Sequence, residues 1–190
     1  MALGPDALTT WDRVKAVLGY QDDQEMLVEF LIDAVSVTAN RIAGRKLKLR
    51  EYDDLRLGGS GRPALLVPEY PIVEVAHLWV DPKRVFDDAT EIPASDFLVT
   101  PEAGMIELYS GVFPRGIGAV KFSGTLGYDE VPQDLELAAI ECIDWNVRRL
   151  SSGTVGTRAV SKDGNVTSQY EITIPTTALS VFESYKSMRL

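Results

Sequence analysis

The side chains that could act as nucleophiles or general bases are few in this sequence. His77 is the only histidine and Cys142 the only cysteine. A Ser-His-Asp or Cys-His site would need His77, which sits between Ala76 and Leu78 in a pattern typical of a β-strand. No G-x-S-x-G motif is present. Cys142 falls on the apolar side of a predicted helix, where a cysteine usually acts as a small hydrophobic residue. We therefore predict no catalytic residue and no enzymatic activity.

Three pairs of adjacent acidic residues are the next candidates, as metal ligands or as acid/base pairs. They are Asp22-Asp23, Asp53-Asp54 and Asp87-Asp88. Adjacent side chains rarely converge on one ion, and the spacing matches no EF-hand loop. The first pair suits a helix cap and the other two suit solvated turns. The glycine cluster at 58–61 lacks the Lys-Ser/Thr of a phosphate-binding loop and indicates a turn. The sequence thus predicts no metal and no cofactor.

Basic residues concentrate in one segment of an otherwise acidic chain. They are Arg41, Arg45, Lys46, Lys48 and Arg50. If residues 46–50 form a strand, Lys46, Lys48 and Arg50 share one face. Two interpretations stay open: a charged edge strand that blocks aggregation, or a contact with an acidic neighbouring subunit or with DNA backbone.

Composition limits the class of protein. The chain has 190 residues, 45% hydrophobic, which suits one domain with a core of its own. A net charge of −9 argues against a protein that grips nucleic acid by neutralising phosphates. The N-terminus lacks the features of a signal peptide, and no apolar run reaches the roughly 18 residues of a membrane span. We expect a protein that contacts no membrane and is used, or assembled, in a cytoplasm.

Two helices are predicted at the N-terminus. Thr9 or Thr10 can cap the first, which ends at Gly19. Asp22 or Asp23 opens the second, which ends at Gly44. The core-facing side of the second helix is predicted from the i, i+3, i+4, i+7 spacing as Leu27, Phe30, Leu31, Ala34, Val35, Thr38 and Ile42.

Signals typical of β-structure follow Gly44. Short strands are predicted at 46–50, 65–67, 72–80, 97–100, 105–109 and 119–123. Frequent prolines between them favour a small twisted antiparallel sheet over a large barrel. Residues 151–162 indicate a polar loop, and residues 169–174 a strand.

The stretch 120–150 leads from an apolar strand into a long third helix. Gly127-Tyr128 marks a turn, and Val131-Pro132 places a proline at the helix start. The apolar residues of this helix cover an arc of roughly 200°, wider than the stripe of a surface helix. The helix should therefore pack on more than one side. The arc contains Leu135, Ala138, Ala139, Cys142, Ile143, Val147 and Leu150, with Trp145 at its margin.

A fourth helix is predicted from Pro175 through Met188, with a thin apolar stripe of Leu179, Phe182 and Tyr185. The predicted fold class is α+β. It has four helices, two N-terminal, one long central and one C-terminal, with an inserted small antiparallel β-sheet portion. We place residues 1–190 in one domain, with 46–123 as the β-rich insertion and 151–190 as a C-terminal arm.

In this order, the segments resemble the head–tail connector, or head-completion adaptor, family of tailed bacteriophages. The resemblance covers nearly the whole chain. It is most specific at GYDEVPQDL (127–135) after a strand. The helix pair, YPIVEVAHLWV, SDFLVTPEAGMIEL and the closing SQYEITIPTTALSVFESYKSM contribute to it. Residues 46–108 are longer than the compact members need, which indicates an enlarged β portion.

The resemblance implies a structural virion protein. Members form a homo-oligomeric ring, commonly of twelve, beneath the portal protein, extend the DNA channel and dock a stopper or tail protein. Genomic DNA passes without sequence-specific binding, and the ring sits in the virion neck after assembly in the host cytoplasm. The C-terminal segment of such adaptors engages the portal. The resemblance therefore implies the following portal-binding residues: Leu179, Phe182, Tyr185, Lys186 and Arg189. Leu137 and Trp145 are expected between subunits.

Other functions stay open beside the adaptor. One is another neck ring protein, such as a stopper or tail terminator, although four helices favour the adaptor. The other is a small enzyme or ligand-binding module that uses the β portion, with His77 and a nearby acid as its catalytic candidates.

Overall fold

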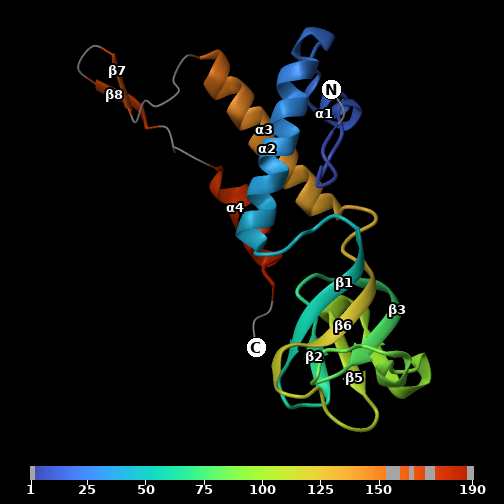
Figure 1. The fold of residues 1–190 in the computed structure, drawn as a ribbon. Helices are drawn as coiled ribbons and strands as arrows, with labels where there is room; N and C mark the ends of the chain where they lie inside the picture. The colour runs from blue at the N-terminus through green and yellow to red at the C-terminus, as the bar shows by residue number, and fades with distance from the viewer. Residues whose placement is uncertain (1–2, 153–158, 163–164, 170–173, 188–190) are drawn as a thin grey trace. The chain divides into compact units, whose positions relative to one another are not determined.

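The structure is a computed structural model that describes residues 3–152, 159–162, 165–169 and 174–187 (Figure 1). Within these ranges the chain forms four α-helices and eight β-strands, so the predicted α+β class is confirmed. The chain divides into two compact units. Met1–Gly44 and Val131–Lys186 form a helical unit, and Arg45–Glu130 forms the main part of a β-rich unit.

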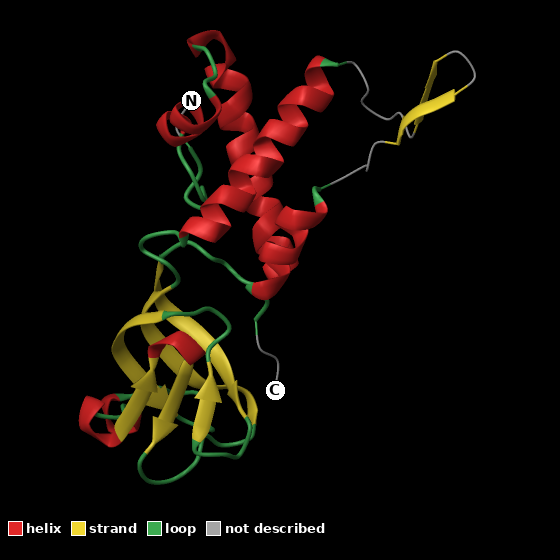
Figure 2. Cartoon of the chain, turned by 180° about the vertical axis from the view of Figure 1, so that it is seen from behind, coloured by secondary structure: helices red, strands yellow, loops and turns green. Residues whose placement is uncertain are grey.

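The helical unit is built around two long helices that run in opposite directions (Figures 1 and 2). They are α2 (Glu25–Ala43) and α3 (Gln133–Ser151). Both contact α4 (Thr176–Ser184), and α1 (Trp11–Leu18) contacts α2. Side chains that the three contacting helices bury include Val28, Leu31, Ile32, Val35 and Ala39 of α2, Ala138, Ala139, Cys142 and Ile143 of α3, and Ala178 and Phe182 of α4.

Local capping explains the ends of the first helix. Thr10 caps α1 by accepting a hydrogen bond from the Arg13 backbone N–H, and Gly19 ends it with a left-handed φ of 71°. Both predicted ends are confirmed. Gly44 ends α2 in the same way.

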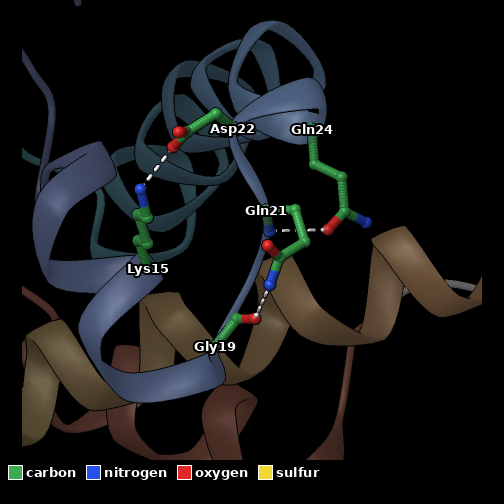
Figure 3. Close-up of polar contacts among 5 residues, drawn as sticks. All are labelled: Lys15, Gly19, Gln21, Asp22 and Gln24. Atoms are coloured by element: carbon green, nitrogen blue, oxygen red, sulfur yellow. Dashed lines mark hydrogen bonds and ion pairs between the residues drawn. The ribbon is translucent and has the colours of Figure 1, made fainter.

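The start of α2 differs from the prediction. A short 3₁₀ turn, Asp22–Gln24, precedes the helix and is capped by Gln21, so neither Asp22 nor Asp23 is the cap. The Gln21 backbone N–H donates to Gln24 Oε1 at 3.2 Å, and Gln21 Nε2 donates to the Gly19 carbonyl at 3.2 Å (Figure 3). Asp22 instead pairs with Lys15 of α1. The hydrogen bonds at this helix start therefore involve Gln21 and Gln24 rather than the predicted aspartates.

Helix α3 begins directly after Pro132, with Asp134 and Glu136 in its first turn and Arg148 and Arg149 in its last. This charge order suits the helix dipole. Besides α2 and α4, α3 meets the N-terminal segment through two hydrogen bonds. Thr9 Oγ1 donates to Glu136 Oε1 at 3.0 Å, and the Tyr20 hydroxyl donates to Asp144 Oδ1 at 2.8 Å. Packing on more than one side is therefore confirmed.

The β-rich unit contains two three-stranded antiparallel sheets. The first has the order β1-β6-β3, from Arg50–Gly59, Gly116–Leu126 and Ile72–Val80. The second has the order β2-β5-β4, from Ala64–Leu66, Met105–Leu108 and Phe97–Thr100. Both sheets bury side chains in one core, which includes Leu57, Leu65, Leu78, Phe97, Ile106, Phe113 and Phe122.

The predicted strand at 46–50 is wrong, because β1 begins only at Arg50. Residues 46–49 instead run beside the chain that leaves β6. The Tyr128 N–H donates to the Leu47 carbonyl at 2.8 Å, and the Leu49 N–H donates to the Tyr128 carbonyl at 3.0 Å. Lys48 and Tyr128 form an isolated bridge.

Strand β1 itself was missed because its sequence lacks the usual alternation. Asp53 and Asp54 lie where the register of β1 on β6 shifts, so this acidic pair occupies a bulge within a strand rather than a turn. Gly58 and Gly59 end the strand, so only part of the glycine cluster is a turn. A Cβ on Gly59 would lie 2.2 Å from the Pro114 carbonyl oxygen, which explains the glycine.

The C-terminal part also differs from the prediction. Ala159–Lys162 is a strand, β7, paired with β8 (Asn165–Gln169), where a loop was predicted up to residue 162. Of the strand predicted at 169–174, residues 170–173 lie outside the described residues and Ile174 is not in a strand. Helix α4 ends at Ser184 rather than near Met188.

Candidate assembly surfaces

His77 lies on β3 and has an acidic partner. Its Nδ1 is 2.6 Å from Glu91 Oε1, and its ring stacks on Trp79 with centroids 5.2 Å apart. The pairing arises because Trp79 and Glu91 form an antiparallel bridge. Such a pair can orient an imidazole, but a catalytic site also needs a group that reacts with substrate. The His77 side chain is 54% exposed, as expected for a surface cross-strand pair.

Cys142 is buried between the helices. Desolvation chiefly, and the nearby Glu141 carboxylate, raise the pKa of its thiol to about 12, so the thiol is protonated and poorly nucleophilic at neutral pH. Among the described residues, no three His, Cys, Asp or Glu side chains cluster as metal ligands would. Within the same ranges, no helix has the length and apolar character to span a membrane.

The basic segment is more enclosed than predicted. The Arg45 side chain is buried, with its guanidinium 3.4 Å from the centre of the Tyr70 ring, and it donates to the Tyr70 carbonyl. Lys46, Lys48 and Arg50 are half-buried, and Lys48 Nζ donates to the Asp129 carbonyl at 2.9 Å. These residues therefore stabilise the start of the β-rich unit and present only part of their surface.

The residues of the predicted portal-binding stripe on α4 differ in how deeply they are buried. Phe182 is fully buried in the helical unit, whereas Leu179 and Tyr185 are half-buried. Lys186 is exposed and pairs with Glu183 at 2.7 Å. Arg189 lies outside the described residues. Part of the apolar stripe thus completes the core of this chain itself.

The outer face of α3 contains both residues predicted between subunits. Leu137 is 60% exposed, and Trp145 is half-buried along a groove of about 460 Å³ between α3 and the start of α4. Trp145 Nε1 is buried, and no described residue accepts a hydrogen bond from it. Arg148 follows on the same face and pairs with Asp144 at 2.8 Å.

The outer face of α2 is a second exposed apolar surface, and the sequence analysis missed it. Met26, Phe30 and Val37 are 77%, 64% and 57% exposed, and the exposed Ala34 and Arg41 lie on the same side. Phe30 was predicted in the core, but the buried face of α2 is formed by Val28, Leu31, Ile32, Val35 and Ala39. Apolar residues occupy both faces, so the 3.6-residue spacing alone could not orient the helix. Helix α2 has more apolar residues than one buried stripe requires, and this excess could have indicated a second apolar surface.

One loop of the β-rich unit is held in an unusual conformation. The Asp81 carboxylate accepts hydrogen bonds from the backbone N–H groups of Lys83 (2.8 Å), Val85 (2.6 Å) and Phe86 (3.2 Å). Arg84 and Phe86 have positive φ angles of 61° and 55°. Non-glycine residues keep such angles only where their surroundings impose them. Desolvation raises the pKa of Asp81, but the three N–H donors and Lys83 outweigh it, so the pKa lies below its ordinary value.

Comparison with protein families found one match across nearly the whole chain. A family model described as "Head completion protein" matches residues 7–188. A comparison with curated proteins found no match.

Solved structures share the fold at low sequence identity. The first is a chain of the neck of an empty gene transfer agent (GTA) particle computed with C6 symmetry, with a TM-score of 0.60 and 16% identity, covering 100% of this chain and 95% of that one. The second comes from the neck of a native GTA particle computed with C12 symmetry, with a TM-score of 0.57, 16% identity and coverage of 100% and 97%. A chain of the native particle's virion has a TM-score of 0.52, 14% identity and coverage of 100% and 94%.

Proposed function

The chain belongs to the head completion protein family, and we propose that it is a structural ring subunit of a virion neck, acting as a head–tail adaptor. In this proposal, identical copies form a ring beneath the portal protein. The ring continues the DNA channel and offers a docking surface to a stopper or tail protein. Genomic DNA passes through without being bound by sequence. Assembly takes place in the host cytoplasm.

The observation that carries the proposal is the full-length likeness to chains of GTA particle necks. The comparison covers 100% of this chain with a TM-score of 0.57, and that neck was computed with C12 symmetry. This favours a ring of twelve copies.

The exposed apolar residues of the helical unit support assembly. Met26, Phe30, Val37 and Leu137 are each more than half exposed. Burial of such side chains against another protein surface is favourable by about 25 cal/mol per Å². A subunit that exposes apolar side chains on two helix faces therefore gains stability from neighbours on both sides.

We assign the remaining contacts by position. The segment after α4, from Lys186 through Arg189, engages the portal, with Leu179 and Tyr185 beside it and Phe182 holding α4 in place. Lys46, Lys48 and Arg50 contribute a charged contact with a neighbouring subunit or with DNA backbone. We treat residues 1–190 as one adaptor, with 46–123 as its β-rich insertion and 151–190 as its arm.

Size-exclusion chromatography with light scattering tests this function, on the full chain alone and mixed with a purified portal ring. We expect either rings of the free chain or a stable complex with the portal ring, visible as rings by electron microscopy. A chain that stays monomeric and binds no portal would contradict the proposal. Binding to the end of a tail tube instead would identify a tail terminator.

A further inference from the structure

The helical unit exposes two helix faces whose residues complement one another. On α2, an angle of about 100° per residue places Met26, Phe30, Ala34, Val37 and Arg41 within an arc of about 80°. On α3, Asp134, Leu137, Glu141, Trp145 and Arg148 likewise fall within an arc of about 80°. Each face lies opposite the buried side of its own helix, by which α2 and α3 contact each other, and one edge of the α3 face borders α4 through the bonds to Asp134 and Glu141. The two outer faces therefore point away from each other.

We propose that the outer face of α2 packs antiparallel against the outer face of α3 of a second copy, with Phe30 opposite Trp145 and Val37 opposite Leu137. The inference rests on the proposed ring function and specifies which surfaces join the subunits. The occupant of each face is another copy of this chain. Because the two faces differ, the contact is head-to-tail, the type of contact that can close into a ring.

The relative direction of the helices follows from the ring. Neighbours in a ring of twelve differ by a rotation of about 30°. Since α2 and α3 run in broadly opposite directions and cross within one copy (Figure 1), α2 of one copy and α3 of the next also run in broadly opposite directions.

The pairing order provides the second argument. With Phe30 opposite Trp145, Val37 falls about one residue from Leu137, an axial offset of about 1.5 Å. Arg41 then falls opposite Asp134. One register thus aligns two apolar pairs, Phe30 with Trp145 and Val37 with Leu137, and one pair of opposite charges, Arg41 with Asp134.

Burial supplies a third argument. The indole N–H of Trp145 lies buried in the α3–α4 groove without an acceptor among the described residues, and an unpaired buried donor is unfavourable. The proposed contact places a second copy of the chain beside this groove.

Disulfide trapping in assembled rings tests the register. Val37→Cys combined with Leu137→Cys should form disulfide-linked oligomers under mild oxidation. Phe30→Cys with Leu137→Cys is the matched control. It uses the same two faces but is displaced by about 12 Å along the helix, beyond the reach of a disulfide. The native Cys142 is buried and should not interfere. Equal linking of both pairs, or linking of the control alone, would overturn the register.

Charge reversal provides an independent measurement. Arg41→Glu should lower the fraction of chain in rings at least tenfold at low salt, while the circular dichroism of the variant stays unchanged. Rings that form normally in all variants and give no Val37–Leu137 disulfide would refute this interface but leave the ring function intact. Absence of rings in the unmodified chain, with and without portal, would instead refute the function.

Discussion

The hydroxyl of Tyr185 donates a hydrogen bond to Asp134 Oδ1 at 2.7 Å and so joins the end of α4 to the first turn of α3. Together with Thr177, which donates to Glu141, this contact fixes α4 along α3 at both ends. Helix α4 is therefore part of the helical unit, and we expect the chain beyond Tyr185 to contact a partner without disturbing this unit.

Removing residues 186–190 should abolish or strongly weaken portal binding while thermal stability changes by less than a few degrees. The deletion leaves Phe182 and the Tyr185–Asp134 bond in place. A pull-down with purified portal, paired with a thermal melt, measures both. Deletion of residues 180–190 is the comparison, because it also removes the buried Phe182 and should unfold the helical unit. Undiminished portal binding by the shorter deletion would contradict the assignment.

Phe182→Ala should destabilise the helical unit by about 3–5 kcal/mol, the usual cost of removing a fully buried phenylalanine side chain. Denaturant unfolding followed by circular dichroism measures the change. Leu179→Ala is the control, since Leu179 is only half-buried and should cost clearly less. Equal losses of unfolding free energy for the two variants would show that Phe182 contributes no more to the core than Leu179.

Gly127→Ala should destabilise the junction between β6 and the third helix more than Gly44→Ala destabilises the end of α2. Both glycines have positive φ angles, 99° and 68°. A Cβ at position 127 would lie 2.7 Å from the Lys48 carbonyl oxygen, whereas position 44 has open space. Gly44→Ala should therefore cost only about 1 kcal/mol, the conformational part. Comparable melting temperatures for the two variants would argue against the steric explanation.

The stability of the helical unit should fall as pH rises above 9. Burial raises the pKa of Cys142 from 9.0 to about 12, so above pH 9 the unfolded chain loses a proton that the folded chain retains. The loss is at most about 1.4 kcal/mol per pH unit until the folded pKa is reached. Burial also raises the pKa of Tyr20, which adds to the decline from pH 10 upward. In Cys142→Ala, unfolding free energies between pH 9 and 10 should lose this slope. An unchanged slope would mean that another group causes it.

Asp81→Asn should loosen the loop at 82–86. One amide oxygen replaces a carboxylate that accepts three backbone N–H groups. Hydrogen exchange of Lys83, Val85 and Phe86 should accelerate at least tenfold, with little change in the β-strands. In the unmodified protein, the lowered pKa of Asp81 means that this protection persists above pH 3.8 and disappears only at lower pH. Slow exchange at these amides in the variant would show that the carboxylate does not hold the loop.

Sequence patterns predicted the elements that have one clear signal. Strand β3 at Ile72–Val80 and the caps Thr10, Gly19 and Gly44 were found because apolar alternation and glycine geometry act locally. The family resemblance came from the order of such elements.

The failures came from residues whose placement depends on distant partners. Strand β1 combines Asp53, Asp54 and two terminal glycines, and only its pairing with β6 makes it a strand. Phe30 was placed in the core because α2 is apolar on both sides, and local spacing cannot distinguish a core from an assembly surface. The acidic partner of His77 depends on a bridge between Trp79 and Glu91, which no sequence spacing reveals.

The bridge between Lys48 and Tyr128 holds the entry and exit of the β-rich unit beside each other. The two ends of this segment lie close together. Its length can therefore change without changing the distance between the chain segments that flank it. The β-rich unit is thus a replaceable module. A short linker in its place should yield a minimal helical subunit.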